Sequence, residues 1–170
     1  MRGAGKKKLI SEKIVDGWKI HLTQGYFTFV SDEDIERVSN QKWHVVITKG
    51  RKYVRGYKKE NGKFKGIFLH RYILGLTNPK TQVDHIDGNG LNNRRNNLRS
   101  ATHIQNCQNK LSVRSKTGIR GVYKAKNGWV ASICVNRKLM HLGYFKEISE
   151  AQKTRKEAEE KYFQEFAPIK

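Results

Sequence analysis

A carboxylate and an imidazole stand side by side in the middle of the chain, at Asp84 and His85. A carboxylate can bind a hard cation, and a neutral imidazole can take a proton from water near neutral pH. Adjacent residues on a strand point to opposite faces, so these side chains cannot form a simple hydrogen-bonded pair. A bend would let Asp84 hold a metal while His85 reaches a water. Taken alone, such a dipeptide more often consists of ordinary turn residues, here ahead of Asp87-Gly88, than of catalytic residues.

The surrounding residues predict a strand, an Asn-rich loop, a second strand and a helix. Gln82 to Asp87 alternates as a short strand does, and the polar loop follows it. Leu98 to Ala101 predicts the second strand. Thr102 can cap a helix that runs from His103 to about Lys110. Upstream, Asn61-Gly62 predicts a hairpin turn between two strands, and Phe68 to Leu76 predicts a short helix that ends at Gly75 and Asn78-Pro79.

These elements carry a motif that resembles the HNH endonucleases of phages and mobile introns. The resemblance rests on the runs H-R-Y-I-L-G (70–75), V-D-H-I-D-G-N-G-L-N-N-R-R-N-N-L-R-S-A-T (83–102) and Q-N-C-Q-N (105–109). Within them, the order and spacing of four polar residues match the family: Asp84, His85, Asn97 and Asn106. The resemblance implies a ββα-metal fold and hydrolysis of phosphodiester bonds in DNA.

The resemblance also implies a role for each of the four residues. His85 would be the general base that takes a proton from the attacking water. Asp84 and Asn106 would hold one divalent cation, magnesium, for which manganese can substitute. Asn97 would tie down the loop and orient His85. Asn106 stands where many members have His, so it offers an oxygen without a charge and we expect modest metal affinity.

Other side chains of the motif admit two interpretations. His70 can approach the phosphate as an accessory group, or it can be a packed histidine on an apolar helix. His103 can act in the same way, or it can lie beside the helix cap. Arg94, Arg95 and Arg99 can be solvated charges, but in a stretch without acids they are expected to bind phosphates.

The charge of the chain points to a polyanionic partner. Thirty-five Lys and Arg residues stand against 15 Asp and Glu, for a net charge of +20. From Gly88 through Lys146 there is no Asp or Glu at all. Such a balance favours phosphates, and double-stranded DNA is the expected partner.

The C-terminal part predicts three strands and a helix. The strands are expected at 119–124, 129–135 and 139–144, and Ser149 with Gln152 predicts a capping box for a helix to about Phe166. The runs G-I-R-G-V-Y-K, W-V-A-S-I-C-V and H-L-G-Y-F resemble the Apetala-two, or ethylene-response-factor, DNA-binding domain. This resemblance implies a three-stranded antiparallel sheet packed on one helix, with the open face in the major groove.

Alternation along the strands predicts which side chains face the DNA. Trp129, Ala131, Ile133 and Val135 share the face that packs on the helix. The expected DNA face is then Arg120, Tyr123, Lys124, Ser132, Arg137, Lys138 and His141.

The expected fold class is α+β. The N-terminal part also resembles phage HNH proteins, through I-H-L-T-Q-G-Y-F-T-F-V-S-D-E-D (20–34) and Lys42-Trp43. The expected divisions are a basic tail (1–11), a β-rich segment (12–66), the nuclease core (67–111), a linker (112–117) and the DNA-binding domain (118–167).

Several further expectations concern the setting of the protein. Two cysteines without a C-x-x-C pair give no structural zinc, and they suit the inside of a cell, such as the cytoplasm of a phage-infected or intron-bearing bacterium. No membrane and no small-molecule substrate are expected, and the protein is expected to be a monomer or a weak dimer. One site cuts one strand, so nicking is the default, while the target sequence and a homing role stay open.

Two other function classes compete with the nuclease. One is a DNA-binding regulator whose HNH core is only a scaffold, and the four intact motif residues argue against it. The other is an RNA-binding protein, against which the sequence shows no exposed aromatic platform of the expected kind.

Overall fold

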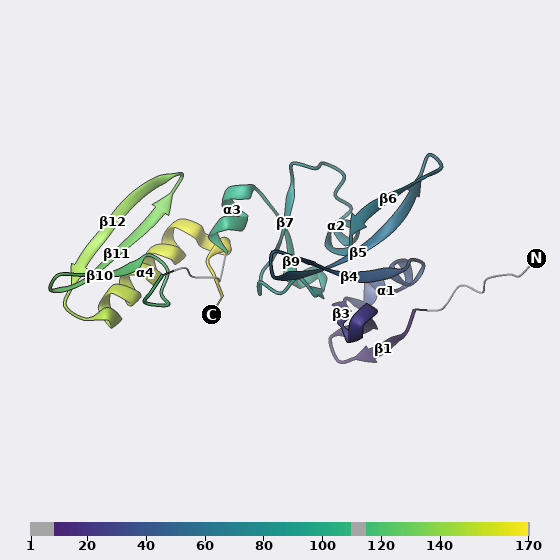
Figure 1. Cartoon of the computed structure of the whole chain (residues 1–170), viewed down its shortest axis with the longest axis horizontal. Helices are drawn as coiled ribbons and strands as arrows, with labels where there is room; N and C mark the ends of the chain where they lie inside the picture. The colour runs from purple at the N-terminus through teal and green to yellow at the C-terminus, as the bar shows by residue number, and fades with distance from the viewer. Residues whose placement is uncertain (1–8, 110–114, 170) are drawn as a thin grey trace, which may run out of the picture. The chain divides into compact units, whose positions relative to one another are not determined.

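The computed structural model describes residues 9–109 and 115–169 as a mixed α+β structure with several small sheets (Figure 1). The predicted α+β class is therefore confirmed. The chain divides into two compact units, residues 1–100 and 101–170. Among the helices described, none is long and apolar enough to cross a membrane.

The first sheet of the N-terminal unit joins three early strands to a much later one. Its order is β1 (Ser11–Ile14), β2 (Gly17–His21), β3 (Phe27–Val30) and β8 (Asn92–Asn93). β3 and β8 pair in parallel, whereas the other pairs are antiparallel. This parallel pairing places the Asn-rich loop beside β3.

Strand β1 begins at Ser11, which lies inside the predicted tail of residues 1–11. The backbone N–H of His21 donates to Ile10 O at 2.9 Å, and Ser11 lies opposite Ile20. Residues 1–8 of the predicted tail, and 110–114 of the nuclease core and linker, lie outside the described residues. Ser-Glu-Lys-Ile has too few apolar residues to predict a strand, and only its pairing with β2 reveals β1.

A second sheet is a simple antiparallel meander of β4 (Trp43–Thr48), β5 (Arg51–Glu60) and β6 (Lys63–Phe68). β5 and β6 are joined by Asn61 and Gly62, both with positive φ, of 47° and 77°. A two-residue hairpin needs this conformation at both positions, so the predicted turn is confirmed.

The core of the N-terminal unit lies between these sheets and two helices, α1 (Asp32–Ser39) and α2 (Leu69–Leu74). Gly75 ends α2 in the left-handed conformation with φ 66°, as predicted from the sequence. The buried apolar side chains come from β2, β3, α1, β4, β5, α2 and β9 (Leu98–Ala101): Ile20, Val30, Val38, Trp43, Val54, Leu69, Ile73 and Leu98.

The C-terminal unit holds a three-stranded antiparallel sheet and a long helix. The elements are α3 (His103–Gln108), β10 (Val122–Ala125), β11 (Gly128–Val135), β12 (Lys138–Phe145) and α4 (Ile148–Phe163). Ala131 packs with Ala151 of α4, and Ile133 packs with Ala158. The helix-facing parity expected for β11 therefore agrees with the structure.

The start of α4 differs from the prediction. Its capping box is formed by Glu147 and Glu150, two residues before the predicted pair of Ser149 and Gln152. A glutamate side chain at the cap accepts the third backbone N–H of the helix as a serine would, so Ser149 falls inside the first turn.

A buried ion pair in α4 was not predicted. The Arg155 guanidinium is 4% exposed, donates to Ser132 O at 3.0 Å, and lies 2.9 Å from Glu159 Oε1. Burial lowers the pKa of Arg155, although the Glu159 charge opposes that shift. Both residues lie on the buried face of the helix, together with Ala151 and Ala158.

We expect Glu159→Ala to lower the free energy of unfolding by about 3–5 kcal/mol, because it leaves the buried Arg155 charge without its partner. Urea unfolding followed by circular dichroism measures the change. Glu157→Ala, at an exposed position of the same helix, is the matched control. Unchanged stability of Glu159→Ala would show that the pair is dispensable.

Candidate active site

Asp84 and His85 end strand β7 (Gln82–His85), which pairs with β9 in a two-stranded sheet. The two side chains point in different directions, as neighbours on a strand should. Asp84 contacts Arg99, whereas His85 contacts the rings of Tyr53 and His70. Asp84 is only 4% exposed and His85 only 6%, so both lie within the protein.

Asn97 closes the loop between β7 and β9. Its Nδ2 donates to Asp87 Oδ1 at 2.9 Å and to Asn92 O at 2.8 Å, and its Oδ1 accepts from the Asp87 backbone N–H at 3.0 Å. The loop is thus tied at both ends by one buried side chain. The Asp87 carboxylate also accepts from the Asn89 backbone, so it serves the loop.

The His85 ring is held by Asn93, a residue that the sequence did not single out. Asn93 Nδ2 donates to Thr28 Oγ1 at 2.9 Å and approaches Gly90 O at 3.4 Å. These contacts orient the amide so that Oδ1 faces His85 Nε2, at 3.4 Å. An amide oxygen only accepts, so this contact requires a proton on Nε2, and the basic lone pair of the neutral ring is on Nδ1.

The choice of Asn93 depends on the fold. Four asparagines follow Gly90, and nothing local distinguishes one from another. The parallel pairing of β8 with β3 selects Asn93, because it places this residue against Thr28, 65 positions away. No pattern in the sequence predicts that pairing.

The electrostatic surroundings keep His85 neutral. Burial lowers the pKa of His85, and this effect outweighs the hydrogen bond that the ring donates to Asn93 and the charges of Asp87 and Asp84, which raise the pKa. The uncharged imidazole is the form that can accept a proton.

His70 lies directly against His85. Its ring stacks on Phe68, with centroids 5.4 Å apart, and meets the His85 ring edge to face at 5.1 Å. Burial lowers the pKa of His70 to about 3, with smaller contributions from the charges of His85 and Arg71. Its Nδ1 is buried and has no hydrogen-bond partner among the residues that the structure describes. His70 is therefore packed as a core histidine and is also adjacent to the candidate base.

We expect the buried His70 ring to make the N-terminal unit sensitive to acid. Its folded pKa lies below its ordinary value of 6.5, so the unfolded chain takes up the proton first as the pH falls. Stability should be intact above about pH 6.5 and should fall by about 2 kcal/mol by about pH 5 from this group alone. Urea unfolding of His70→Phe should show a shallower pH dependence. His21→Ala, at an exposed position, is the control, and an unchanged slope in His70→Phe would refute the assignment.

Asp84 is the one anionic candidate ligand at the site. The Arg99 guanidinium contacts its Oδ2 through Nε at 2.8 Å and through an Nη at 2.7 Å. Arg99 was expected to bind a phosphate, but in this structure it pairs with Asp84, the candidate metal ligand. Among the described residues, no group of three or more His, Cys, Asp or Glu side chains is arranged so that it could hold a metal ion.

The donor chemistry nevertheless fits a hard divalent cation. Magnesium is commonly held by one or two carboxylates and completes its shell with water and substrate phosphate. Asp84 supplies such an oxygen, and the amide of Asn106 is the second candidate. Asn106 and His103 lie on α3, which is counted with the C-terminal unit, so the pairing of Asn106 with Asp84 stays a prediction.

Arg94 and Arg95 attach the loop to the N-terminal elements. Arg95 forms two 2.9 Å contacts with Asp34, whose side chain is 1% exposed. Arg94 donates to Asp16 O at 2.7 Å and lies over the Phe29 ring at 4.5 Å. Their expected contacts with phosphates remain predictions, and in this structure both guanidinium groups bind the protein itself.

In the C-terminal unit, Tyr123, Ser132 and His141 lie on the sheet face away from α4. Lys124 is opposite Trp129 on the helix side, so it does not share that face as expected.

The remaining members of the predicted DNA face differ in their exposure. Arg120 donates to Gln108 O at 2.7 Å and Cys107 O at 3.1 Å, so its guanidinium supports α3. Ser132 is buried, whereas Arg137, Lys138 and His141 are exposed. A role of these residues in DNA binding stays a prediction.

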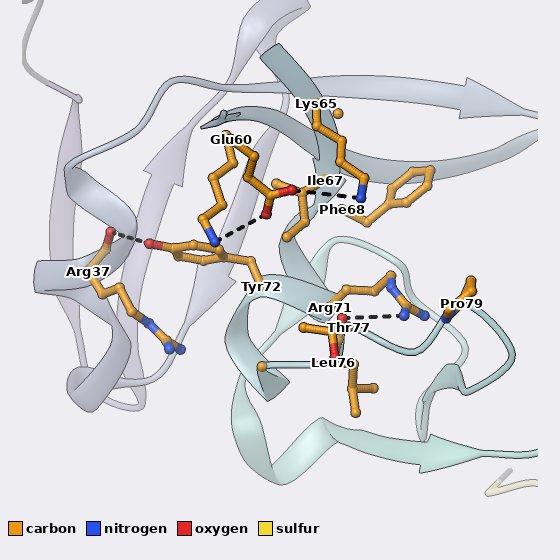
Figure 2. A pocket seen from close by; sticks show the side chains of 13 residues that line it. Arg37, Glu60, Lys65, Ile67, Phe68, Arg71, Tyr72, Leu76, Thr77 and Pro79 are labelled. Carbon is orange, nitrogen blue, oxygen red and sulfur yellow. Dashed lines mark hydrogen bonds and ion pairs between the residues drawn. The ribbon is translucent and has the colours of Figure 1, made fainter. Parts of the chain in front are cut away.

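A pocket of about 570 Å³ lies elsewhere in the N-terminal unit (Figure 2). Its basic lining is already engaged, because Glu60 pairs with Lys58 and Lys65 and Arg71 donates to backbone carbonyls of Leu76 and Asn78. Neither Asp84 nor His85 lines it.

Two comparisons with known proteins bear on this site. Residues 68–108 match the family model described as HNH endonuclease. The chain is also 36% identical over 120 residues to an uncharacterized HNH endonuclease of Acanthamoeba polyphaga mimivirus, over 66% of this chain and 58% of that protein. The match thus spans less than two thirds of the relative's length. No solved structure matches the chain significantly.

Proposed function

We propose, on the premise that residues 68–108 form an HNH endonuclease domain, that this protein is a metal-dependent endonuclease that cuts DNA. The observation that carries the proposal is the arrangement at the end of β7. A neutral, oriented His85 lies beside the carboxylate of Asp84, in a loop that Asn97 closes. Base, anionic ligand and loop brace all fall within the segment that matches the family.

In the proposed reaction, His85 takes a proton from the water that attacks the phosphorus. The new P–O bond forms as the bond to the 3′ oxygen breaks, which leaves a 5′ phosphate and a 3′ hydroxyl. A divalent cation held by Asp84 and Asn106 would supply positive charge to the phosphate. Asn93 keeps the proton of the resting ring on Nε2, and Asn97 keeps the loop closed around the site.

DNA is the proposed substrate, because the net charge of +20 and the acid-free stretch from Gly88 to Lys146 suit a polyphosphate. The C-terminal unit is proposed as a reader of double-stranded DNA. Its open sheet face carries exposed Tyr123, Leu139, His141 and Tyr144, and its resemblance to the Apetala-two domain supports this role. A homing function and the expected bacterial cytoplasm belong to the proposal as well.

The test is the conversion of supercoiled plasmid, with magnesium and with EDTA. We expect magnesium-dependent nicking, because a single site of this kind cuts one strand, and no conversion in EDTA. Gel electrophoresis separates supercoiled, nicked and linear forms. Tight DNA binding without conversion of any phage or host DNA would support a regulator with a non-catalytic HNH scaffold instead.

A further inference from the structure

One face of the β4–β5–β6 sheet is left open in the N-terminal unit. Trp43, Val45 and Val54 are buried on the other face, toward the core. The open face carries the alternate residues of the three strands, in register. Tyr57 is 54% exposed and Phe64 is 74% exposed, so the face presents large apolar rings to solvent.

A series of contacts between aromatic rings and one guanidinium group leads from Tyr57, on this face, to the candidate base. The Arg55 guanidinium lies 5.9 Å from the Tyr57 ring and 5.9 Å from the Phe68 ring. Phe68 stacks on His70 at 5.4 Å, and His70 contacts His85 at 5.1 Å. We call Phe64, Tyr57, Arg55, Phe68 and His70 the aromatic stripe.

Arg55 is placed to bind an anion. It forms no ion pair among the described residues, and its Nε is buried without a hydrogen-bond partner. The guanidinium lies across Gly66 of β6, where any Cβ would overlap it. Glycine at position 66 therefore leaves a place for this side chain between two rings.

The charge of the open face complements a phosphate backbone. Strand alternation places Arg51, Arg55 and Lys59 on it, and the three strands, all of them described, contribute no Asp or Glu to it. Glu60, the acid of these strands, lies on the opposite face, where it pairs with Lys58 and Lys65 (Figure 2).

We propose that the aromatic stripe binds an unpaired stretch of the DNA substrate and leads that strand to His85, an inference that rests on the proposed endonuclease function. Bases inside a duplex offer only their edges, whereas an unpaired base offers a flat face that stacks on aromatic rings. Tyr57 and Phe64 supply exposed rings, and Arg55 supplies a guanidinium for a phosphate or a base. The expectation that the chain lacks an exposed aromatic platform was therefore wrong, because the hairpin brings the rings of two strands onto one face.

The test is binding of a labelled single-stranded DNA by the full chain, measured by fluorescence anisotropy in EDTA and at physiological salt. We expect the stripe variants to weaken binding of this strand more than binding of the duplex of the same sequence, which the C-terminal unit is also proposed to bind. Tyr57→Ala and Phe64→Ala should each weaken strand binding by about fivefold or more. Tyr57→Phe should keep the affinity. A 2-aminopurine base in the strand should be quenched by the intact protein and less by Tyr57→Ala.

Lys58→Gln is the matched control for Arg55→Gln, because it removes the same charge from the opposite face of the same strand. We expect a larger loss of affinity in Arg55→Gln. Equal affinities of the intact protein and Tyr57→Ala for the single strand would overturn the stripe while leaving the nuclease proposal standing. A preference for RNA of the same sequence would overturn DNA as the ligand. Plasmid cleavage is scored separately, so a protein that binds the strand but never cuts would refute the function alone.

Discussion

His85→Ala is expected to lower the rate of DNA cleavage by about a thousandfold or more, because it removes the proposed general base. DNA affinity should be unchanged, since the ring is 6% exposed and contributes little to the surface. The measurement is the single-turnover rate of plasmid nicking with magnesium, beside a binding assay in EDTA. Added imidazole should restore part of the rate, because the substitution leaves space between Tyr53, His70 and Asn93.

The control for this variant is His21→Ala, whose side chain lies exposed on β2. It should cut at the rate of the intact protein. A fully active His85→Ala protein would remove His85 from the reaction. A loss of both cutting and binding, with a lowered free energy of unfolding, would show instead that the ring is needed for packing.

Asp84→Asn is expected to abolish magnesium-dependent cleavage, a loss of about a thousandfold or more, because an amide replaces the anionic ligand. The substitution keeps the shape of the side chain but removes the charge opposite Arg99, 2.7 Å away. We therefore also expect a lower free energy of unfolding, since the guanidinium is only 14% exposed. Rates measured across a magnesium titration separate weak metal binding from a slow reaction.

Asp16→Asn is the control for Asp84→Asn, because Asp16 is an exposed residue of the same unit whose carboxylate has no part in the proposed site. It should retain magnesium-dependent cutting. Full activity of Asp84→Asn at the same magnesium concentration would exclude Asp84 as a ligand.

Local patterns predicted much of the fold. The Asn61-Gly62 turn, the Gly75 end of α2 and the Thr102 cap of α3 all depend on residues close in sequence, and each is present. The alternation of β11 also predicted its helix-facing side, because a strand buried on one side must alternate.

Local patterns did not predict the contacts between residues that lie far apart in the sequence. Asn93 was missed because β3 selects it, and Arg99 was assigned to phosphate because its ion pair with Asp84 joins two strands. The buried pair of Arg155 and Glu159 was not predicted, since a charged residue on a helix gives no sign that it is buried with a partner. In each case the determining contact links elements that the sequence does not order in space.

The pairing of β3 with β8 determines how much of the chain must be moved to carry the proposed site into another protein. Thr28 holds both Asn93 and the Leu91 carbonyl, the latter at 2.6 Å, across 63 positions of chain. A chimera that carries residues 68–108 alone would leave Asn93 without its anchor and His85 without its orientation. The smallest graftable piece therefore begins at the first sheet and runs through α3, so that it keeps both Thr28 and the candidate ligand Asn106.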